Sequence, residues 1–437
     1  MSGLAKLLKN LGFFVAGSDA RMSRETQELE SMGISVHMGH EMNHIHNHDL
    51  VIYSSAVTQS NPERREALLR SVPIFHRSDL LAMLMNQAIS IGIAGTHGKT
   101  TTTAFASFIF NRAGIKPSCL VGGRMINFNS NVLVGDSHLF LAEVDESDRT
   151  HLKYQPDYAV VTNLEEDHLD TYQNFENLKQ SFKEYISNIK STGHLIYCGH
   201  DEQLREISDC AGKRISYGLS KQFDFGAEEI QMHGFSSQYK LFEKGKPIQK
   251  VQLSVPGKHN VLNSLAAIAV AKSFGLSYKS FIDSTAQFRG VGRRLEIKLQ
   301  TEKLTVIDDY AHHPTEIEAS LQAIRTLGKH TTVVFQPHRY SRTRYLQESF
   351  SKSFHQADRV ILTDIYSAGE ENLDGVDVRD LYGLLKEKHP NVSLVSKKQI
   401  VEQLISEEST EGVVAFLGAG DITEVASEFA ARFNHTN

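Results

Sequence analysis

The segment that decides the fold of this chain is Ile89-Ser-Ile-Gly-Ile-Ala-Gly-Thr-His-Gly-Lys-Thr-Thr-Thr-Thr103. Its first six residues form a β-branched strand pattern, and Gly95 and Gly98 then let backbone amides turn toward an anion. The helix that follows begins with its positive dipole end at the same anion. Lys99 would reach the outer phosphates of a nucleotide, and the Thr100 hydroxyl would sit on its Mg²⁺. The order of strand, glycine loop and helix predicts a phosphate-binding site in an α/β domain.

This phosphate loop differs from the common P-loop pattern, because Ile93 stands where that pattern has glycine. The loop is therefore a shortened Gly-x-x-Gly-Lys-Thr. A glycine turn that opens an ordinary helix is the alternative, and the four threonines at 100–103 argue against it. The residues expected to contact the nucleotide are Gly95, Thr96, His97, Gly98, Lys99, Thr100 and Thr101.

Composition limits the class of protein. The chain has 437 residues, 40% of them hydrophobic, and a net charge of −6. The acidic balance argues against nucleic-acid or membrane-surface binding, which needs excess basic charge. No apolar run approaches the ~20 residues of a membrane-spanning helix. The three cysteines, which show no paired or metal-binding spacing, indicate a reduced cytoplasmic compartment: Cys119, Cys198 and Cys210.

Strand and helix patterns alternate along the chain, which predicts an α/β fold of three domains at residues 1–85, 86–290 and 291–437. Polar or glycine residues follow most strands, as at the ligand-binding edge of parallel sheets. The expected strands after the phosphate loop are 138–143, 158–162, 304–308, 331–335, 359–363 and 413–417. Two shorter strands, 13–16 and 50–53, precede it.

Two acidic segments follow strands of the second domain. They are Ala142-Glu-Val-Asp-Glu-Ser-Asp148 and Asn163-Leu-Glu-Glu-Asp-His-Leu-Asp170. In a parallel sheet both emerge at the edge of the phosphate loop, where Glu146 and His168 could bind Mg²⁺. Each segment alone also fits a solvated loop. Their occurrence together favours the metal site.

A further motif, Val255-Pro-Gly-Lys-His-Asn-Val-Leu-Asn263, breaks the chain before a helix. Asn260 and Asn263 lie three residues apart, on one face of the first turn, where side-chain amides can contact an adenine edge. Simple N-capping by Asn260 is the alternative.

Seven ordered motifs together carry a resemblance to a known family. They are Ala94-Gly-Thr-His-Gly-Lys-Thr-Thr-Thr-Thr103, Val144-Asp-Glu-Ser-Asp148, Thr162-Asn-Leu-Glu-Glu-Asp-His-Leu-Asp-Thr-Tyr172, Pro256-Gly-Lys-His-Asn260, Gly292-Arg-Arg294, Asp308-Asp-Tyr-Ala-His-His-Pro-Thr-Glu316 and Phe335-Gln-Pro-His-Arg-Tyr-Ser-Arg-Thr-Arg344. They resemble the motifs of the Mur ligases, in the branch that adds alanine, and cover nearly the whole chain.

The resemblance implies a Rossmann-like UDP-binding domain, a central P-loop ATPase with a mainly parallel sheet, and a C-terminal Rossmann-like domain that receives an amino acid. It implies ATP-dependent joining of L-alanine to the carboxylate of UDP-N-acetylmuramate through an acyl phosphate, in peptidoglycan precursor synthesis. ATP, Mg²⁺, UDP-N-acetylmuramate and L-alanine are the expected ligands. The expected state is a cytoplasmic monomer or weak homodimer that binds no nucleic acid and does not enter a membrane.

The resemblance also assigns roles to residues by matching motifs. The catalytic set is Lys99, Glu146, His168, Arg294 and His312, and the metal ligands are Thr100, Glu146 and His168. Asn260 and Asn263 would contact adenine, and Arg294 the transferred phosphate. The residues that would face the amino acid are Tyr310, His312, Arg339 and Arg342, for which a basic surface loop is the alternative. The candidates for the UDP part are Ser18, Asp19, His40, Ser54 and Ser55.

The start of the chain departs from the family pattern. Met1-Ser-Gly-Leu-Ala5 matches the point where family members have completed a first strand and a Gly-x-Gly-Gly-x-Gly turn. We therefore expect a truncated first domain, a reading frame that begins upstream, poor binding of the UDP-sugar and exposed strand edges.

Three alternative functions share part of these motifs. The recycling ligase that attaches a ready-made tripeptide to the same UDP-sugar resembles the chain less at His338-Arg-Tyr-Ser-Arg-Thr-Arg344. Folylpolyglutamate synthetase shares the ATPase but lacks the pattern of the first domain. A non-catalytic nucleotide- or sugar-binding protein is the third alternative, and amino-acid-dependent phosphate release separates all of them.

Overall fold

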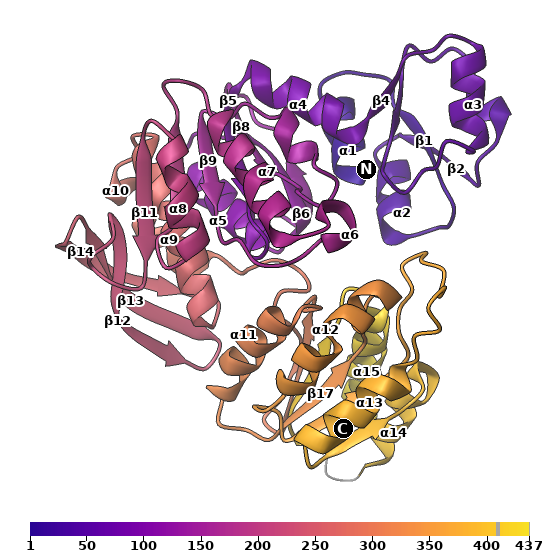
Figure 1. Ribbon diagram of the computed structural model, residues 1–437, viewed down its shortest axis with the longest axis vertical. Helices are drawn as coiled ribbons and strands as arrows, with labels where there is room; N and C mark the ends of the chain where they lie inside the picture. The colour runs from indigo at the N-terminus through magenta and orange to yellow at the C-terminus, as the bar shows by residue number, and fades with distance from the viewer. Residues whose placement is uncertain (408–410, 437) are drawn as a thin grey trace. The chain divides into compact units, whose positions relative to one another are not determined.

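A computed structural model of the protein describes residues 1–407 and 411–436 (Figure 1). The chain forms two compact units. The first contains residues 1–228, 241–249 and 262–284, and the second contains 229–240, 250–261 and 285–437. Both are built on parallel-rich sheets, as the α/β pattern predicts.

The N-terminal segment carries two separate two-stranded parallel sheets in the described chain, β1 with β2 and β3 with β4. Helices flank these pairs of strands. One of them, α4, buries Leu81 and Met85. The elements are α1 (Ser2–Asn10), β1 (Ala16–Asp19), α2 (Arg24–Ser31), β2 (Ser35–Met38), η1 (Met42–His44), β3 (Val51–Tyr53), α3 (Pro62–Leu69), β4 (Ile74–His76) and α4 (Arg77–Gln87).

The prediction of a strand at 13–16 is wrong. Strand β1 begins only at Ala16, and Phe13 and Phe14 precede it with 58% and 104% of their surface exposed. The reason is the end of helix α1. Gly12 takes φ +91°, and the Phe13 N–H bonds the Leu8 carbonyl at 3.1 Å, which is the six-to-one bond of a Schellman turn. The helix-ending turn therefore takes up the residues that look like the start of a strand.

The central sheet has ten strands in the order β14-β13-β12-β11-β10-β9-β5-β8-β6-β7. The pairs on both sides of β5 are parallel, so the loops after β5, β8 and β9 meet at one edge. The strands are β5 (Ile89–Ala94), β6 (Ser118–Met125), β7 (Ser130–Leu133), β8 (Leu139–Glu143), β9 (Tyr158–Val161), β10 (His194–Cys198), β11 (Arg214–Gly218), β12 (Phe225–His233), β13 (Ser236–Glu243) and β14 (Lys246–Leu253).

Two helices associated with this sheet are buried along most of their length, which explains their weak amphipathic pattern. Helix α5 buries every residue from Thr100 to Phe110, and α9 buries Leu265 to Ala271. The other helices are shorter or one-sided. The helices of this region are α5 (Lys99–Arg112), η2 (Thr150–Lys153), α6 (Leu169–Tyr172), α7 (Phe175–Ser187), α8 (Glu202–Ile207), η3 (Ser208–Cys210), α9 (Lys258–Ser273), α10 (Tyr278–Phe281) and η4 (Ile282–Gln287).

The C-terminal region forms a six-stranded sheet in the order β15-β16-β20-β17-β18-β19, parallel except for β15. Strands β16, β17 and β20 are buried on both faces, with a hydrophobic cluster on each side. The elements are β15 (Glu296–Gln300), β16 (Leu304–Asp309), α11 (Pro314–Arg325), β17 (Thr331–Phe335), α12 (Tyr340–Lys352), β18 (Arg359–Leu362), α13 (Val378–Lys388), β19 (Val392–Leu394), η5 (Lys397–Gln399), α14 (Ile400–Ser406), β20 (Gly412–Leu417) and α15 (Ile422–Thr436). The remaining predicted strands match these bounds and those of β3, β8 and β9 to within one residue.

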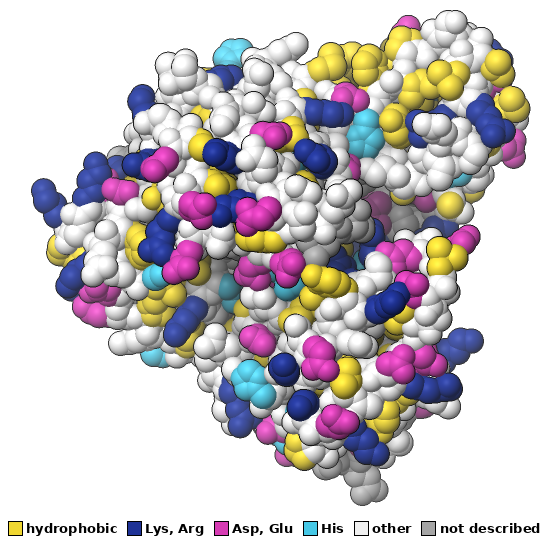
Figure 2. All heavy atoms as spheres, viewed as in Figure 1, with side chains coloured by type: hydrophobic (Ala, Val, Ile, Leu, Met, Phe, Trp, Pro, Cys, Tyr) yellow, Lys and Arg dark blue, Asp and Glu magenta, His cyan; other side chains and the backbone are white. Residues whose placement is uncertain are grey.

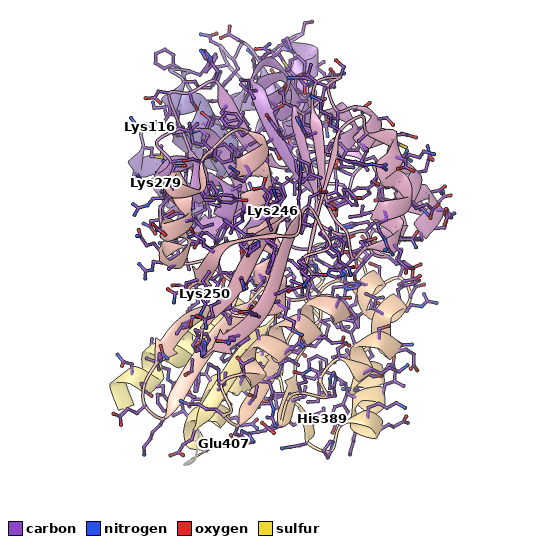
Figure 3. All side chains as sticks on the ribbon, turned by 90° about the vertical axis from the view of Figure 1, so that its left-hand side faces the viewer. Lys116, Lys246, Lys250, Lys279, His389 and Glu407 are labelled. Atoms are coloured by element: carbon purple, nitrogen blue, oxygen red, sulfur yellow. The ribbon has the colours of Figure 1, made fainter. Side chains whose placement is uncertain are left out.

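Polar contacts fasten the helices at the edge of this C-terminal sheet. The His389 Nε2–H donates to the Ala357 carbonyl at 2.9 Å, and Arg359 donates to both oxygens of Glu407 at 2.6 and 2.9 Å. His389 and Glu407 are labelled in Figure 3.

The molecular surface carries basic and acidic side chains interspersed on the face shown in Figure 2. Hydrophobic side chains gather over the N-terminal elements, where Leu68 and Leu69 at the end of α3 are 68% and 75% exposed. Among the described residues, no helix is long and apolar enough to span a lipid bilayer.

Candidate active site

The phosphate loop joins β5 to α5, and the close approach of neighbouring groups explains its glycines. Gly95 has φ +125°, and a Cβ there would lie 2.2 Å from Thr162 Oγ1. Gly98 has φ +82°, and a Cβ there would lie 2.6 Å from Asn263 Oδ1. Any larger residue at either position would therefore meet both strain and collision. The loop passes so close to β9 and α9 that only glycine fits.

The loop after β9 holds the phosphate loop in place. Asn163 accepts from the His97 backbone N–H at 2.8 Å and donates from Nδ2 to the His97 carbonyl at 3.0 Å. Thr162 Oγ1 donates to the same carbonyl at 2.6 Å, and Thr96 Oγ1 accepts from the Glu165 N–H at 2.9 Å. Thr162 and Asn163 were not predicted as site residues, although they follow directly on the buried strand β9.

Lys99, Glu146 and His168 converge at the edge of the central sheet. Lys99 Nζ lies 2.8 Å from Glu146 Oε1 and donates to the carbonyls of Gly95 and Thr96 at 2.6 and 3.0 Å. His168 Nε2 lies 3.4 Å from the same Glu146 oxygen. Burial acts to lower the pKa of Lys99, but the charges of Glu146 and Glu143 outweigh it and raise that pKa. Three segments far apart in sequence therefore form one charged cluster.

The same balance holds for His168. Burial acts to lower its pKa, and the hydrogen bond to Glu146 together with the charge of Asp167 raises it above the ordinary value. His168 has φ +55°, an uncommon conformation for a residue with a side chain, and it directly precedes the short helix α6. Its carbonyl accepts from the Tyr172 N–H at 3.0 Å.

Thr100 contacts the carboxylate of Glu143, which was not predicted as a site residue. Its hydroxyl donates to Glu143, with distances of 2.9 and 3.1 Å to the two oxygens, and Glu143 Oε2 also accepts from the Gly122 N–H at 2.9 Å. Burial raises the pKa of Glu143, against the opposing effects of Lys99 and Thr100. A signal was present, because Glu143 is the acidic last residue of an otherwise apolar strand. Glu143 joins the candidate metal-binding set.

The donor atoms fit a hard divalent cation. Glu146 is 1% exposed, and its Oε2 is buried without a hydrogen-bond partner among the described residues. A buried carboxylate oxygen without a hydrogen bond is destabilised, and a bound cation would stabilise it. Carboxylate oxygens and a threonine hydroxyl are ligands that Mg²⁺ prefers. Glu143, Glu146 and Thr100 are therefore the residues that could hold it, with His168 beside them.

The two candidate adenine-contacting asparagines have different surroundings. Asn263 Oδ1 accepts from Thr102 Oγ1 at 3.2 Å and lies against Gly98, so it packs beside the phosphate loop. Asn260 is the third residue of α9, and its Nδ2 donates to the Pro256 carbonyl at 2.7 Å. The alternative that Asn260 is an N-cap is wrong, because Asn260 lies inside the helix and its amide acts as a donor.

In the C-terminal unit, Arg294 and His312 contact one carboxylate, Glu316, and the Tyr310 ring lies beside both of them. Arg294 Nη1 lies 3.4 Å from Glu316 Oε1, and the His312 N–H donates to Glu316 Oε2 at 3.0 Å. The Arg294 guanidinium lies 5.0 Å from the centre of the Tyr310 ring, a cation–π distance. The predicted residues Arg294, Tyr310 and His312 therefore lie together in one cluster.

Asp309 fastens this cluster to the sheet and was not predicted. Its two oxygens accept from the backbone N–H groups of Leu295 and Ala311 at 2.6 and 2.7 Å. Burial raises the pKa of Asp309 to about 6, although Arg294 acts to lower it. Because Leu295 follows Arg294 directly, Asp309 fixes the turn that carries that arginine.

Arg339 and Arg342 lie beside His338, a residue of the same motif that was not predicted as a site residue. Arg342 Nη1 donates to His338 Nδ1 at 3.3 Å, and Arg339 pairs with Glu370 at 3.5 Å. The His338 ring stacks on Tyr366 at 5.6 Å. Burial, together with the nearby charges of His312 and three arginines, lowers the pKa of His338 to about 3. His338 is therefore held neutral beside the guanidinium groups of Arg339 and Arg342, which are of the kind that bind an anionic group.

The residues predicted for UDP fall into two groups. Ser18 and His40 meet at 3.0 Å, and both contact Glu63, which Ser18 reaches at 2.6 Å. The Ser55 hydroxyl instead donates to Asp148 at 2.8 Å and lies 3.0 Å from His76 Nε2. Ser54, which precedes Ser55, follows β3 directly. Asp19, at the end of β1, accepts from the Arg21 N–H at 3.3 Å. Glu63, His76 and Asp148 are contacts that short loop motifs could not reveal.

A phosphate loop with buried acidic groups, on a parallel α/β sheet, defines a nucleotide-dependent phosphoryl-transfer enzyme as the class of this protein. Residues 1–88 match the Mur ligase family catalytic domain, 93–271 the Mur ligase middle domain, and 293–420 the Mur ligase glutamate ligase domain. The chain belongs to the Mur ligase family.

Relatives with assigned names and solved structures lie within that family. The UDP-N-acetylmuramate–L-alanine ligase of Geobacter sp. (strain M21) is 41% identical over 99% of this chain and 95% of its own length. The same-named protein of Geotalea daltonii is 40% identical over 99% and 95%. The crystal structure of the UDP-N-acetylmuramate–alanine ligase of Thermotoga maritima is similar with a TM-score of 0.85 and 28% identity, over 100% of this chain and 97% of that one.

Proposed function

We propose that this protein is an ATP-dependent amide ligase that joins L-alanine to the carboxylate of UDP-N-acetylmuramate, releasing ADP and phosphate, in peptidoglycan precursor synthesis. The observation that carries the proposal is the meeting of Lys99, Glu146 and His168 at the phosphate loop, in a chain 41% identical to a protein of that name. Residues 1–85 would hold the UDP-sugar, 86–290 the ATP, and 291–437 the amino acid.

The first step activates a poor electrophile. A muramoyl carboxylate oxygen attacks the γ-phosphorus of ATP, the bond between that phosphorus and the β-phosphate oxygen breaks, and ADP leaves. Catalysis of such a step is mainly positioning and charge stabilisation. Lys99 would leave its contacts with Gly95 and Thr96 and turn its ammonium to the transferred phosphate. Arg294 would add a second cation whose planar fork suits a phosphoryl group.

The second step forms the amide. The neutral amine of alanine attacks the acyl carbon, the bond from that carbon to the phosphate oxygen breaks, and the departing phosphate takes up the proton that the amine gives up. The cationic surroundings of His338, which contain Arg339 and Arg342, suit the alanine carboxylate. Tyr310 and His312 would line the same region.

Mg²⁺, when bound, neutralises negative charge on the nucleotide phosphates. Glu143, Glu146 and Thr100 would hold it, and His168 would complete the set. The buried Oε2 of Glu146 supports this assignment. We further propose a cytoplasmic protein that is a monomer or a weak homodimer.

The deciding experiment measures phosphate release from ATP with UDP-N-acetylmuramate and one amino-acid acceptor at a time. Release that requires both UDP-N-acetylmuramate and L-alanine supports the proposal. Release with a tripeptide but not with alanine would identify the recycling activity instead. Release with folate and glutamate, or no release while both ligands still bind, would also overturn it.

A further inference from the structure

The acidic residues of the loop after β8 contact two parts of the first unit: the phosphate-loop region and the N-terminal segment. Glu146 faces inward to Lys99 and His168. Asp145 and Asp148, on either side, contact residues of the N-terminal segment. We name residues 144–148 the acidic loop. Its burial alternates, because Val144 and Glu146 are buried and Asp145 and Ser147 are partly exposed.

Arg77, the first residue of α4, makes the stronger of these contacts. Its Nη2 donates to Asp145 Oδ2 at 2.6 Å, and Asp145 Oδ1 accepts from the Ser147 N–H at 3.0 Å. A charge-assisted hydrogen bond of this length fixes the carboxylate firmly. Because Asp145 and Ser147 flank Glu146, the position of Arg77 bears directly on the residue that pairs with Lys99.

Ser55 makes the second contact. Its hydroxyl donates to Asp148 Oδ2 at 2.8 Å and lies 3.0 Å from His76 Nε2. Asp148 Oδ1 accepts from the Thr150 N–H at 3.2 Å. This carboxylate therefore also binds the backbone at the start of η2, directly after the acidic loop. Ser55 follows β3, and His76 is the last residue of β4. A ligand that binds at the ends of these two strands therefore contacts the partners of Asp148.

The opposite side of the acidic loop is held by the α6 turn. Tyr172 OH donates to the Glu146 carbonyl at 2.6 Å, and Thr171 Oγ1 donates to the Ser147 carbonyl at 2.7 Å. Tyr172 is 1% exposed, so this anchor is protected from water. Because these hydrogen bonds anchor one side of the acidic loop, we expect a displacement of Arg77 or Ser55 to move the Glu146 side chain.

We propose that Arg77 and Ser55 are positioning residues for Glu146, and that the acidic loop couples binding of the UDP-sugar to binding of the nucleotide and its metal ion. This inference rests on the function proposed above, because it takes the N-terminal segment as the sugar-binding part. Coupling of this kind is reciprocal, so each ligand raises the affinity for the other by the same factor.

The test measures the dissociation constant of ADP with Mg²⁺, in the full chain, with and without saturating UDP-N-acetylmuramate. The ratio of the two constants is the coupling factor. Arg77→Ala is expected to reduce that factor by about fivefold, a typical size for such coupling, and to raise the Mg²⁺ concentration needed for phosphate release. Arg77→Lys, which keeps the charge, is expected to restore part of the coupling and guards against a folding defect.

A matched control is available at the same helix. Lys153 pairs with Asp79 at 2.5 Å and with Ser78 at 3.0 Å, but it lies outside the acidic loop. Lys153→Ala is expected to leave the coupling factor unchanged. Equal loss of coupling in Arg77→Ala and Lys153→Ala, or wild-type coupling in Arg77→Ala, would overturn the inference. A wild-type chain that binds both ligands without coupling would also overturn it, whereas absence of sugar-dependent turnover would refute the proposed function itself.

Discussion

Glu146 binds Lys99 through one carboxylate oxygen at 2.8 Å, while its other oxygen is buried without a hydrogen-bond partner among the described residues. One oxygen of this carboxylate is therefore paired with a cation of the protein, and the other is left available for a ligand. A buried charge in this state is costly by itself. The arrangement is accordingly one that a nucleotide with its metal ion would stabilise.

The ammonium of Lys99 is expected to be essential for phosphoryl transfer. Lys99→Ala should lower turnover by about a hundredfold or more, because one preorganised charge at the transferred phosphate is lost. The rate of ADP formation at saturating substrates measures this effect, and circular dichroism checks that the variant is folded. Near-normal turnover in a folded variant would refute the role of Lys99.

The charge of Glu146 is expected to set the magnesium requirement. Glu146→Gln keeps the shape of the side chain but removes its charge, so the Mg²⁺ concentration for half-maximal activity should rise about tenfold. A titration of activity against Mg²⁺ at fixed total ATP measures the shift. Glu411→Gln, at an exposed site of the C-terminal region, serves as a control. An unchanged midpoint for Glu146→Gln would contradict its role as a ligand.

The Tyr172 hydroxyl is expected to position Glu146 rather than only to stabilise the fold. Tyr172→Phe removes the 2.6 Å bond to the Glu146 carbonyl and should cost about 1 kcal/mol in the free energy of unfolding. It should also raise the Mg²⁺ midpoint. Tyr185 is buried, and its hydroxyl has no hydrogen-bond partner in the part of the chain that the structure describes, so Tyr185→Phe is the matched control and should change neither quantity for the worse. A loss of stability without a shifted midpoint would reduce Tyr172 to a structural role.

Arg342 and Arg339 are expected to bind the carboxylate of alanine. Replacement of either by Ala should weaken the use of L-alanine by ~2–5 kcal/mol, the usual cost of leaving a buried charge unpaired, with little effect on ATP. The Michaelis constants for the two substrates measure this selectivity. Lysine at either position should not restore full activity, because it lacks the two-pronged geometry of arginine. Wild-type constants for alanine in both Ala variants would place its carboxylate elsewhere.

His338 is expected to make stability fall in acid. Its pKa is lowered to about 3 in the folded protein, against an ordinary value of about 6.5. A lowered folded-state pKa means that the unfolded chain binds the proton first, so the stabilising contribution is complete above pH 6.5 and is lost as the pH falls toward 3. His338→Gln should remove up to about 2 kcal/mol of the stability change between pH 6.5 and 5.

Chemical unfolding of the full chain at the two pH values measures that change. The exposed His330, in the same unit, provides the control substitution, and His330→Gln should leave the pH dependence as in the wild type. Equal pH dependence in the wild type and in His338→Gln would show that His338 does not contribute to the loss of stability in acid.

The sequence by itself determined the phosphate loop, the parallel α/β class and the family motifs. These are local features, because a strand, a glycine pair and Lys99 lie within fifteen consecutive residues and need no long-range information. It also placed Glu146 and His168 at one sheet edge, since the carboxyl ends of parallel strands share that edge. The wrong prediction of a strand at residues 13–16 also has a local cause, because Gly12 ends helix α1 in a turn that includes Phe13.

Tertiary structure alone decided which carboxylate meets which partner. Glu143 binds Thr100, and Glu146 binds Lys99, although Glu143 is the last residue of β8 and Glu146 stands only three residues after it. The links from Arg77 to Asp145 and from Ser55 to Asp148 join residues 68 and 93 positions apart. No periodicity encodes such pairs, because side-chain partners across a sheet edge depend on packing and on the direction of each buried group.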